Sequence, residues 1–213
     1  MRTVFEKQLK EINNELIKMG ELIKESVRIA IKGVVNKDKE VLESVITSDF
    51  KVNEKEKKIE RLCLQVLLKQ QPVAKDLRNV LATLKMITDM ERIGDQAADI
   101  CEVTLRLIKK NSAEKLDELQ EVAKESMLMV MQSLEAFVKE DLDLAREVIK
   151  HDDVVDSLFL SIKKELIELM SEKVETGEEA ANLLMIAKYF ERIGDHSTNI
   201  AEWVIFSVTG KHE

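Results

Sequence analysis

The chain has 213 residues and a formal net charge of −8, and 45% of its residues are hydrophobic, 35% charged and only 4% aromatic. This length supports one or two domains with a substantial core, and the single proline and six glycines favour long helices over strands. The acidic balance argues against binding to the phosphate backbone of nucleic acid and favours cations or a partner with a basic surface.

Three segments of the first half carry apolar residues at every third or fourth position, which is the pattern of amphipathic helices. The first segment extends from Phe5 to Val34, and residues 36–38 supply a stop and a new cap. The second extends from Leu42 to Val66 and ends near Pro72, where the only proline supports a boundary. The third extends from Leu84 to Ile108.

The second half repeats this organisation. Ser112 is a predicted helix cap, and the next apolar pattern covers residues 116–137. A fifth pattern covers residues 145–169, residues 176–177 mark a turn, and a sixth pattern covers residues 184–208. Six long helices joined by short connections are expected to pack as antiparallel neighbours, and no segment shows the alternation of a strand.

The two halves are also related residue by residue. Residues 91–95 and 191–195 both read Glu-Arg-Ile-Gly-Asp, and one helix earlier Asp49-x-x-Val52-Asn53 matches Asp152-x-x-Val155-Asp156. A period of about a hundred residues indicates duplication of a three-helix unit. The prediction is an all-α fold of two tandem three-helix bundles, covering residues 1–110 and 111–213.

Carboxylates occupy positions where these helix patterns otherwise have apolar residues, as at Glu56, Glu91 and Glu191. An ionised carboxylate on a packing face is costly unless it is paired, hydrogen-bonded or bound to a cation. Matched acids in both halves therefore predict two metal sites. The first combines Asp49, Asn53, Glu91, Asp95 and Asp99, and the second combines Asp152, Asp156, Glu191, Asp195 and Asn199.

Oxygen donors of this kind suit Mg²⁺, Ca²⁺, Mn²⁺ or iron. Zinc is less favoured, because neither cysteine belongs to the repeated motif and neither His151 nor His196 has a histidine counterpart in the other half. Both histidines are predicted to be peripheral to the sites. The alternative interpretation is a solvated acidic helix face whose carboxylates pair with Arg92 and Arg192.

Gly94 and Gly194 each lie inside a predicted helix, where glycine costs about 1 kcal/mol relative to alanine. Close approach of a neighbouring helix is the favoured reason, and it would also draw facing carboxylates together. The sequence has no glycine-rich phosphate loop, no nucleophile elbow and no Cys-His pair with an orienting group, so we expect no enzymatic activity.

Cys63 and Cys101 lie among apolar residues and are expected to be buried free thiols in a reducing compartment. The charged N-terminus has no apolar region typical of a secretory signal, and no segment has the length of a membrane span. These features predict a cytoplasmic protein.

The sequence resembles the PhoU family of phosphate-signalling regulators along nearly its whole length. The resemblance is carried by both Glu-Arg-Ile-Gly-Asp segments with their Asp-x-x-Val partners, by residues 188–202, and by Gln71–Arg78 at the turn into the third helix. It implies a cytoplasmic negative regulator of the phosphate-starvation response that acts with the ATPase subunit of the phosphate ABC transporter and with a membrane sensor histidine kinase. It also implies a homodimer and metal clusters at the ten residues named above. Asn53 and Asn199 depart from the acidic pattern, one in each half.

Two other functions are compatible with the same residues. One is a metal-storage or metal-dependent phosphate-binding protein without a transporter role, which the acid clusters themselves favour. The other is a purely structural helical adaptor, for which substitutions in the clusters would leave regulation intact.

Overall fold

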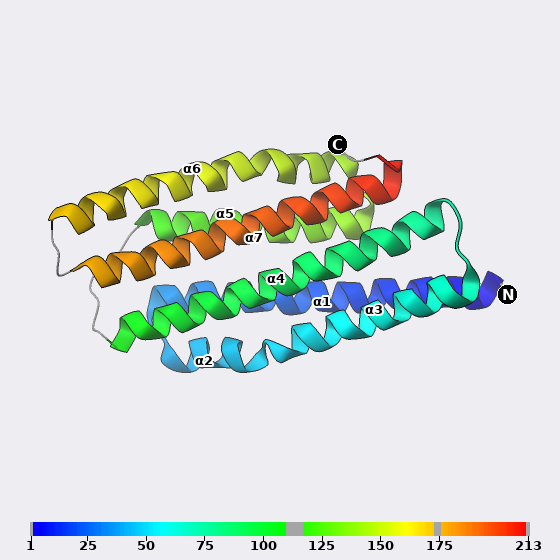
Figure 1. Ribbon diagram of the computed structural model, residues 1–213, viewed down its shortest axis with the longest axis horizontal. Helices are drawn as coiled ribbons and strands as arrows, with labels where there is room; N and C mark the ends of the chain where they lie inside the picture. Colours follow the sequence, from blue (N-terminus) through cyan, green and yellow to red (C-terminus); the bar gives the residue numbers. More distant parts are fainter. Residues whose placement is uncertain (1, 110–116, 173–175, 212–213) are drawn as a thin grey trace.

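The computed structural model describes residues 2–109, 117–172 and 176–211. Within these ranges the protein consists of helices joined by short connections, without a strand. The helices are α1 Arg2–Asn36, α2 Lys39–Ser48, α3 Phe50–Gln70, α4 Lys75–Lys109, α5 Asp117–Lys139, α6 Leu142–Glu172 and α7 Gly177–Thr209 (Figure 1). The predicted all-α fold of two tandem three-helix bundles is confirmed.

One of the six predicted helices is divided at Asp49 into α2 and α3. The hydroxyls of Ser44, Thr47 and Ser48 donate to carbonyl oxygens three or four residues earlier in the chain. Such bonds compete with the backbone ladder and bend helices. The bend places the Asp49 side chain at the junction, where it faces α4. Three predictions lie outside the described residues: the cap at Ser112, the helix start at residue 116 and the division between residues 110 and 111. The division therefore stays a prediction.

The apolar faces predicted from the sequence are buried. On α1 the residues spaced three and four apart are at most 2% exposed: Ile12, Leu16, Met19, Ile23, Val27 and Ala30. Cys63 and Cys101 are fully buried free thiols, as predicted. The helices therefore associate through one continuous apolar core, as the 3.6-residue periodicity requires.

Several helix ends have identifiable caps. Asp38 caps α2 by accepting a hydrogen bond from the Val41 backbone N–H at 3.2 Å. Asp141 caps α6 through Oδ1, which accepts from the backbone N–H groups of Asp143 and Leu144. These carboxylates satisfy N–H groups that the first turn of a helix leaves without partners.

The two three-helix units are joined along α4 and α7, which run side by side in opposite directions at the centre of the molecule (Figure 1). α1 and α5 add a second contact between the units. The two Glu-Arg-Ile-Gly-Asp segments lie near the middle of these central helices, facing α3 and α6 respectively. Among the described helices, none combines the length and the apolar character needed to cross a membrane.

Candidate functional site

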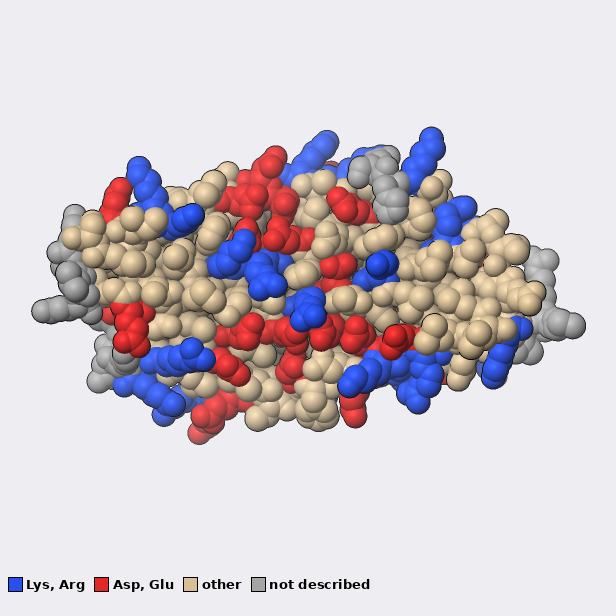
Figure 2. All heavy atoms as spheres, in the orientation of Figure 1, with Lys and Arg blue, Asp and Glu red and all other residues tan. Residues whose placement is uncertain are grey.

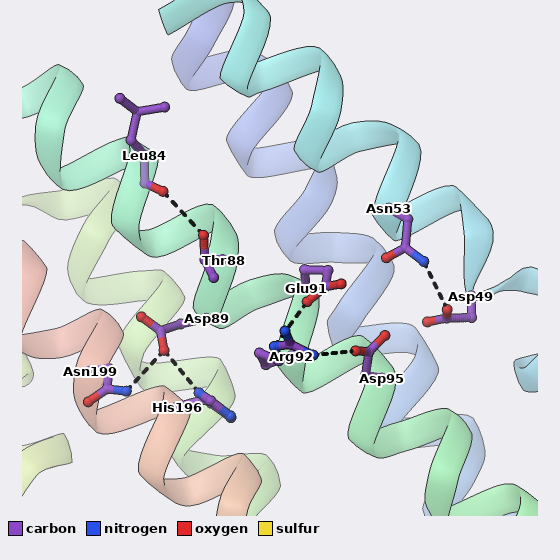
Figure 3. A network of polar contacts seen from close by, with 10 residues as sticks. All are labelled: Asp49, Asn53, Leu84, Thr88, Asp89, Glu91, Arg92, Asp95, His196 and Asn199. Carbon is purple, nitrogen blue, oxygen red and sulfur yellow. Dashed lines mark hydrogen bonds and ion pairs between the residues drawn. The ribbon is translucent and has the colours of Figure 1, made fainter.

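The first acid cluster lies where the beginning of α3 faces the middle of α4 (Figure 3). Asp49 and Asn53 are one turn apart, and the Asn53 amide nitrogen donates to Asp49 Oδ2 at 3.2 Å. Glu91 and Asp95 are one turn apart on α4 and share Arg92 as an ionic partner, with N–O distances of 3.5 and 3.2 Å. The helix packing thus brings together oxygen donors from two helices, with one guanidinium at the border.

Burial makes ionisation of this cluster unfavourable. It raises the pKa of Asp49, Glu91 and Asp99, and the negative charge of nearby Asp95 raises each of them further. Glu56 on α3 behaves in the same way, because burial and neighbouring acids raise its pKa. A bound cation would remove this penalty by pairing with the ionised forms.

Glu56 was not among the predicted ligands, although its apolar register position marked it as unusual. Its place one turn beyond Asn53, facing α4, makes it a further acid of the first cluster. The position seven residues after Asp49 is the signal that could have identified it.

Three buried oxygen atoms in the clusters accept no hydrogen bond: Asp49 Oδ1, Asn53 Oδ1 and Glu191 Oε2. A buried acceptor without a partner costs free energy, and most such atoms in proteins are paired. A cation coordinated by these oxygens would satisfy them. The donor set therefore fits the oxygen-binding metals that the sequence predicts.

The second acid cluster is the more compact of the two. Asp156 on α6 and Glu191 and Asp195 on α7 each offer a carboxylate oxygen within 4.8 Å of the others. Glu191 is only 8% exposed, and its Oε1 forms an ion pair with Lys188. Burial, followed by repulsion from Asp195 and Asp156, raises the pKa of Asp152 to about 6. In the described part of the chain this is where carboxylates gather most closely.

The clusters share one face of the molecule. Figure 2 shows acidic side chains gathered along the middle of this face, in two groups with lysine and arginine side chains between them. Arg92 is exposed and pairs with Glu91 and Asp95, as the alternative of a solvated acidic face expects. Glu191 and the unpaired oxygens are the part that solvation does not explain.

Gly94 and Gly194 allow the close helix approach that the sequence predicts. A Cβ atom at Gly94 would lie 3.2 Å from Val52 and 3.5 Å from Asp49 Oδ1. At Gly194 it would lie 3.3 Å from Val155 and 3.4 Å from Asp152 Oδ1. In both halves the glycine brings the neighbouring helix near enough for its aspartate to join the acids of the central helix.

Substituting alanine at Gly194 tests this role. Alanine stabilises a helix interior by about 1 kcal/mol relative to glycine, but here its methyl group would push apart α6 and α7. We expect no net gain in the free energy of unfolding, measured by urea denaturation, and weaker binding of Mn²⁺. Gly177, the first residue of α7, is the control for a glycine without a close neighbour, because nothing lies within 4 Å of its added Cβ. A stabilised Gly194→Ala protein with unchanged Mn²⁺ binding would contradict this role.

A polar connection between the two units was not predicted from the sequence. Asp89 Oδ1 on α4 lies 2.9 Å from both His196 Nδ1 and Asn199 Nδ2 on α7 (Figure 3). The side chain of Asn199 is thus shared between the predicted second site and this contact. The counterpart of Asp89 in the other half is Tyr189, so the duplication gave no signal for it.

The two histidines near the clusters bind carboxylates outside the predicted sites. His196 contacts Asp89, and His151 Nε2 lies 2.6 Å from Glu125 Oε2. Neither carboxylate is a predicted metal ligand. The arrangement as a whole can hold cations between helices and change the charge of one face.

Comparison with known protein families gives two matches along the chain. The family model described as the PhoU domain matches residues 16–104 and again residues 119–204. A curated relative from Clostridium acetobutylicum, the phosphate-specific transport system accessory protein PhoU homolog, is 36% identical over 99% of this chain and 96% of its own length. The accessory protein PhoU of Escherichia coli K12 is 31% identical over 97% of this chain and 86% of its own length.

Solved structures show the same likeness. The crystal structure of PhoU from Pseudomonas aeruginosa matches with a TM-score of 0.95 at 31% identity, covering 97% of this chain and 100% of that one. The regulatory protein PhoU from Streptococcus pneumoniae matches with a TM-score of 0.92 at 29% identity, covering 98% and 99%. The similarity therefore extends over both three-helix units.

Proposed function

Because this chain belongs to the PhoU family, we propose that it is an accessory regulator of phosphate transport. The observation that carries the proposal is similarity over nearly the full length to relatives named as accessory proteins of the phosphate-specific transport system. In this proposal the protein acts in the cytoplasm as a homodimer and as a negative regulator of the phosphate-starvation response. It does so without catalysis, through contacts with the transporter ATPase subunit and a membrane sensor histidine kinase.

The proposal includes metal binding at both acid clusters. Support comes from the three carboxylates within 4.8 Å in the second cluster and from the buried oxygens that lack hydrogen bonds. Manganese, magnesium, calcium or iron fits these oxygen donors better than zinc does. The bound cation would neutralise repelling carboxylates and so set the charge of the face that the clusters share.

Gene deletion combined with cluster substitutions tests the proposed function. Deletion should cause alkaline phosphatase expression in high phosphate, and a gene carrying both Glu91→Gln and Glu191→Gln should restore repression only in part, because each cluster loses a charge. Glu54→Gln, at an exposed position of α3, should restore it fully. Unchanged repression after deletion would refute the regulatory function. Full repression by the doubly substituted protein would favour a structural adaptor.

The acid clusters by themselves also support a second candidate, a metal-storage or metal-dependent phosphate-binding protein. Metal analysis of untagged protein, together with phosphate binding in the presence and absence of the metal, discriminates between the two. Metal-dependent phosphate binding without any effect of deletion on repression would favour the second candidate.

A further inference from the structure

The turn between α3 and α4 carries an exposed apolar surface that the acid clusters do not involve. Its members, which we call the leucine patch, are Leu64, Leu68, Val73, Leu77 and Leu81, and they are 46%, 80%, 73%, 36% and 42% exposed. In Figure 2 this end of the molecule, at the right, is mostly free of charged side chains. Contiguous exposed apolar residues of this kind mark interaction sites on folded proteins.

The patch is built by helical spacing on both sides of the turn. Leu64 and Leu68 are four residues apart on the side of α3 away from buried Cys63, and Leu77 and Leu81 are four apart on α4. The four leucines therefore form two short ridges on neighbouring antiparallel helices. A helix of another protein can pack its own apolar ridge against such a pair.

The connecting loop holds Val73 outward at a conformational cost. Gln71 and Ala74 both have φ of 47°, in the left-handed region that residues other than glycine seldom adopt. At Gln71 this conformation ends α3, as Lys37 and Glu140 with φ of 53° and 52° do after α1 and α5. Val73 at the apex is 73% exposed, so the strain does not serve burial of this side chain.

Within the described residues, the second three-helix unit repeats only part of the patch. Offsets read from the duplicated motifs place Ser171 opposite Leu68, Gly177 opposite Leu77 and Ala181 opposite Leu81. Three of the four leucine positions are thus polar or small there, and the fourth, Leu64, has the exposed Ile167 as its counterpart. The difference makes the patch a property of the first unit rather than of the repeat.

The charges around the patch are mainly basic. Lys57 and Arg61 lie seven residues before Leu64 and Leu68, on the same side of α3, and Lys85 lies four residues after Leu81; all three are exposed. Lys75 begins α4 and is half exposed, with Glu140 as its partner at 3.4 Å. Two acids also border the patch among these bases, because exposed Glu60 lies four residues before Leu64 and Asp76 directly precedes Leu77. A partner surface with carboxylates around an apolar centre would complement this rim.

From these features we infer that the leucine patch is a docking surface for a protein partner that presents an apolar helical ridge bordered by carboxylates. A second copy of this chain is disfavoured as the occupant, because a two-fold contact would oppose like charges. A helical partner is favoured over an anionic lipid surface because the leucines form two ridges on antiparallel helices, and vesicle binding is an outcome of the test below. The inference that this partner is a component of the phosphate transport system rests on the proposed function. The inference that the leucine patch is a docking surface does not rest on it.

Two designed helical peptides with the same leucine stripe, one flanked by glutamate and one by lysine, test the surface directly. Fluorescence anisotropy should show that the glutamate peptide binds at least about ten times more tightly than the lysine peptide. Leu68→Ser should weaken binding of the glutamate peptide by about tenfold or more. Ile167→Ser is the matched control, because Ile167 is 52% exposed at the equivalent of Leu64 in the second unit, and its effect should stay within about twofold.

The inference is overturned if the two peptides bind equally, if neither binds, or if both serine variants weaken binding alike. Two further outcomes overturn the inference when neither peptide binds. In the first, Leu68→Ser abolishes binding to phosphatidylglycerol vesicles; in the second, Leu68→Ser dissociates a dimer in sedimentation. A third arm uses the purified cognate ATPase subunit. If that subunit binds wild type and Leu68→Ser equally, the surface inference fails and the proposed function stands. If the ATPase subunit does not bind the wild-type protein but the peptides behave as expected, the proposed contact with this subunit is refuted and the inferred docking surface is retained.

Discussion

Replacing Asp152 with asparagine should raise the stability of the metal-free protein and sharply weaken metal binding. Burial and the charges of Asp195 and Asp156 raise the pKa of Asp152 to about 6, so its ionised form costs free energy at neutral pH. Because the carboxyl is partly open to water, we expect a gain of about 1 to 2 kcal/mol, or a few degrees in Tm. With Mn²⁺ present, loss of the charge should reduce affinity by at least about tenfold.

The pH dependence gives this prediction a definite sign. A carboxyl with a raised folded-state pKa destabilises the protein above that pKa, and the cost disappears as pH falls toward the unfolded value. The advantage of Asp152→Asn in metal-free protein should therefore be largest above pH 6 and vanish near pH 4, where calorimetry can follow it. Asp153→Asn, at the exposed neighbouring position, should change stability by less than about 0.5 kcal/mol. An equal Mn²⁺-induced rise in Tm for wild type and Asp152→Asn would count against the second site.

Most of the fold follows from local pattern. The spacing of Ile12, Leu16 and Met19 predicts which side of α1 is buried, and the side chains are at most 2% exposed. Residues 36–38 are predicted to supply a helix cap, and Asp38 among them does cap α2. These features depend on residues within a turn or two of each other, which is the range over which helical periodicity gives information.

Part of the candidate site is predictable for a different reason. Because the chain is duplicated, the same arrangement occurs twice in the sequence. An acid at an apolar position in both halves is therefore more informative than an acid at such a position in one half. This identifies Glu91 and Glu191, and Glu191 is indeed buried. It also pairs Gly94 and Gly194 with the aspartates that approach them.

What the sequence does not reveal depends on how helices are placed relative to one another. The contact of Asp89 with His196 and Asn199 requires the relative shift of α4 and α7, which are about a hundred residues apart in the chain. No local pattern encodes that shift, and the contact has no counterpart in the other half. The bend at Asp49 likewise depends on several side-chain hydroxyls acting together, while the apolar pattern continues through it.

The buried charge of Glu15 is another feature of helix placement, and its removal should cost far more stability than the loss of an exposed ion pair. Glu15 on α1 is 5% exposed and binds Lys18 at 2.9 Å, Lys55 at 2.6 Å and Lys58 at 3.2 Å. The last two belong to α3, so the carboxylate ties two helices together. Removing it leaves three ammonium groups close together without their acceptor, and we expect Glu15→Gln to cost about 2 to 3 kcal/mol in urea denaturation at pH 7.

Acid titration separates this electrostatic role from simple packing. Hydrogen bonds and ion pairs with Lys18 and Lys55 lower the pKa of Glu15 to about 2, against a usual 4.5. A lowered folded-state pKa means that the stabilisation is complete above pH 4.5 and is lost as pH falls toward 2. The difference between wild type and Glu15→Gln should therefore shrink over that range. Glu25→Gln, which breaks an exposed pair with Arg28 on the same helix, should cost less than about 0.5 kcal/mol. If the two variants lost equal stability, the buried carboxylate would not be the group that joins α1 to α3.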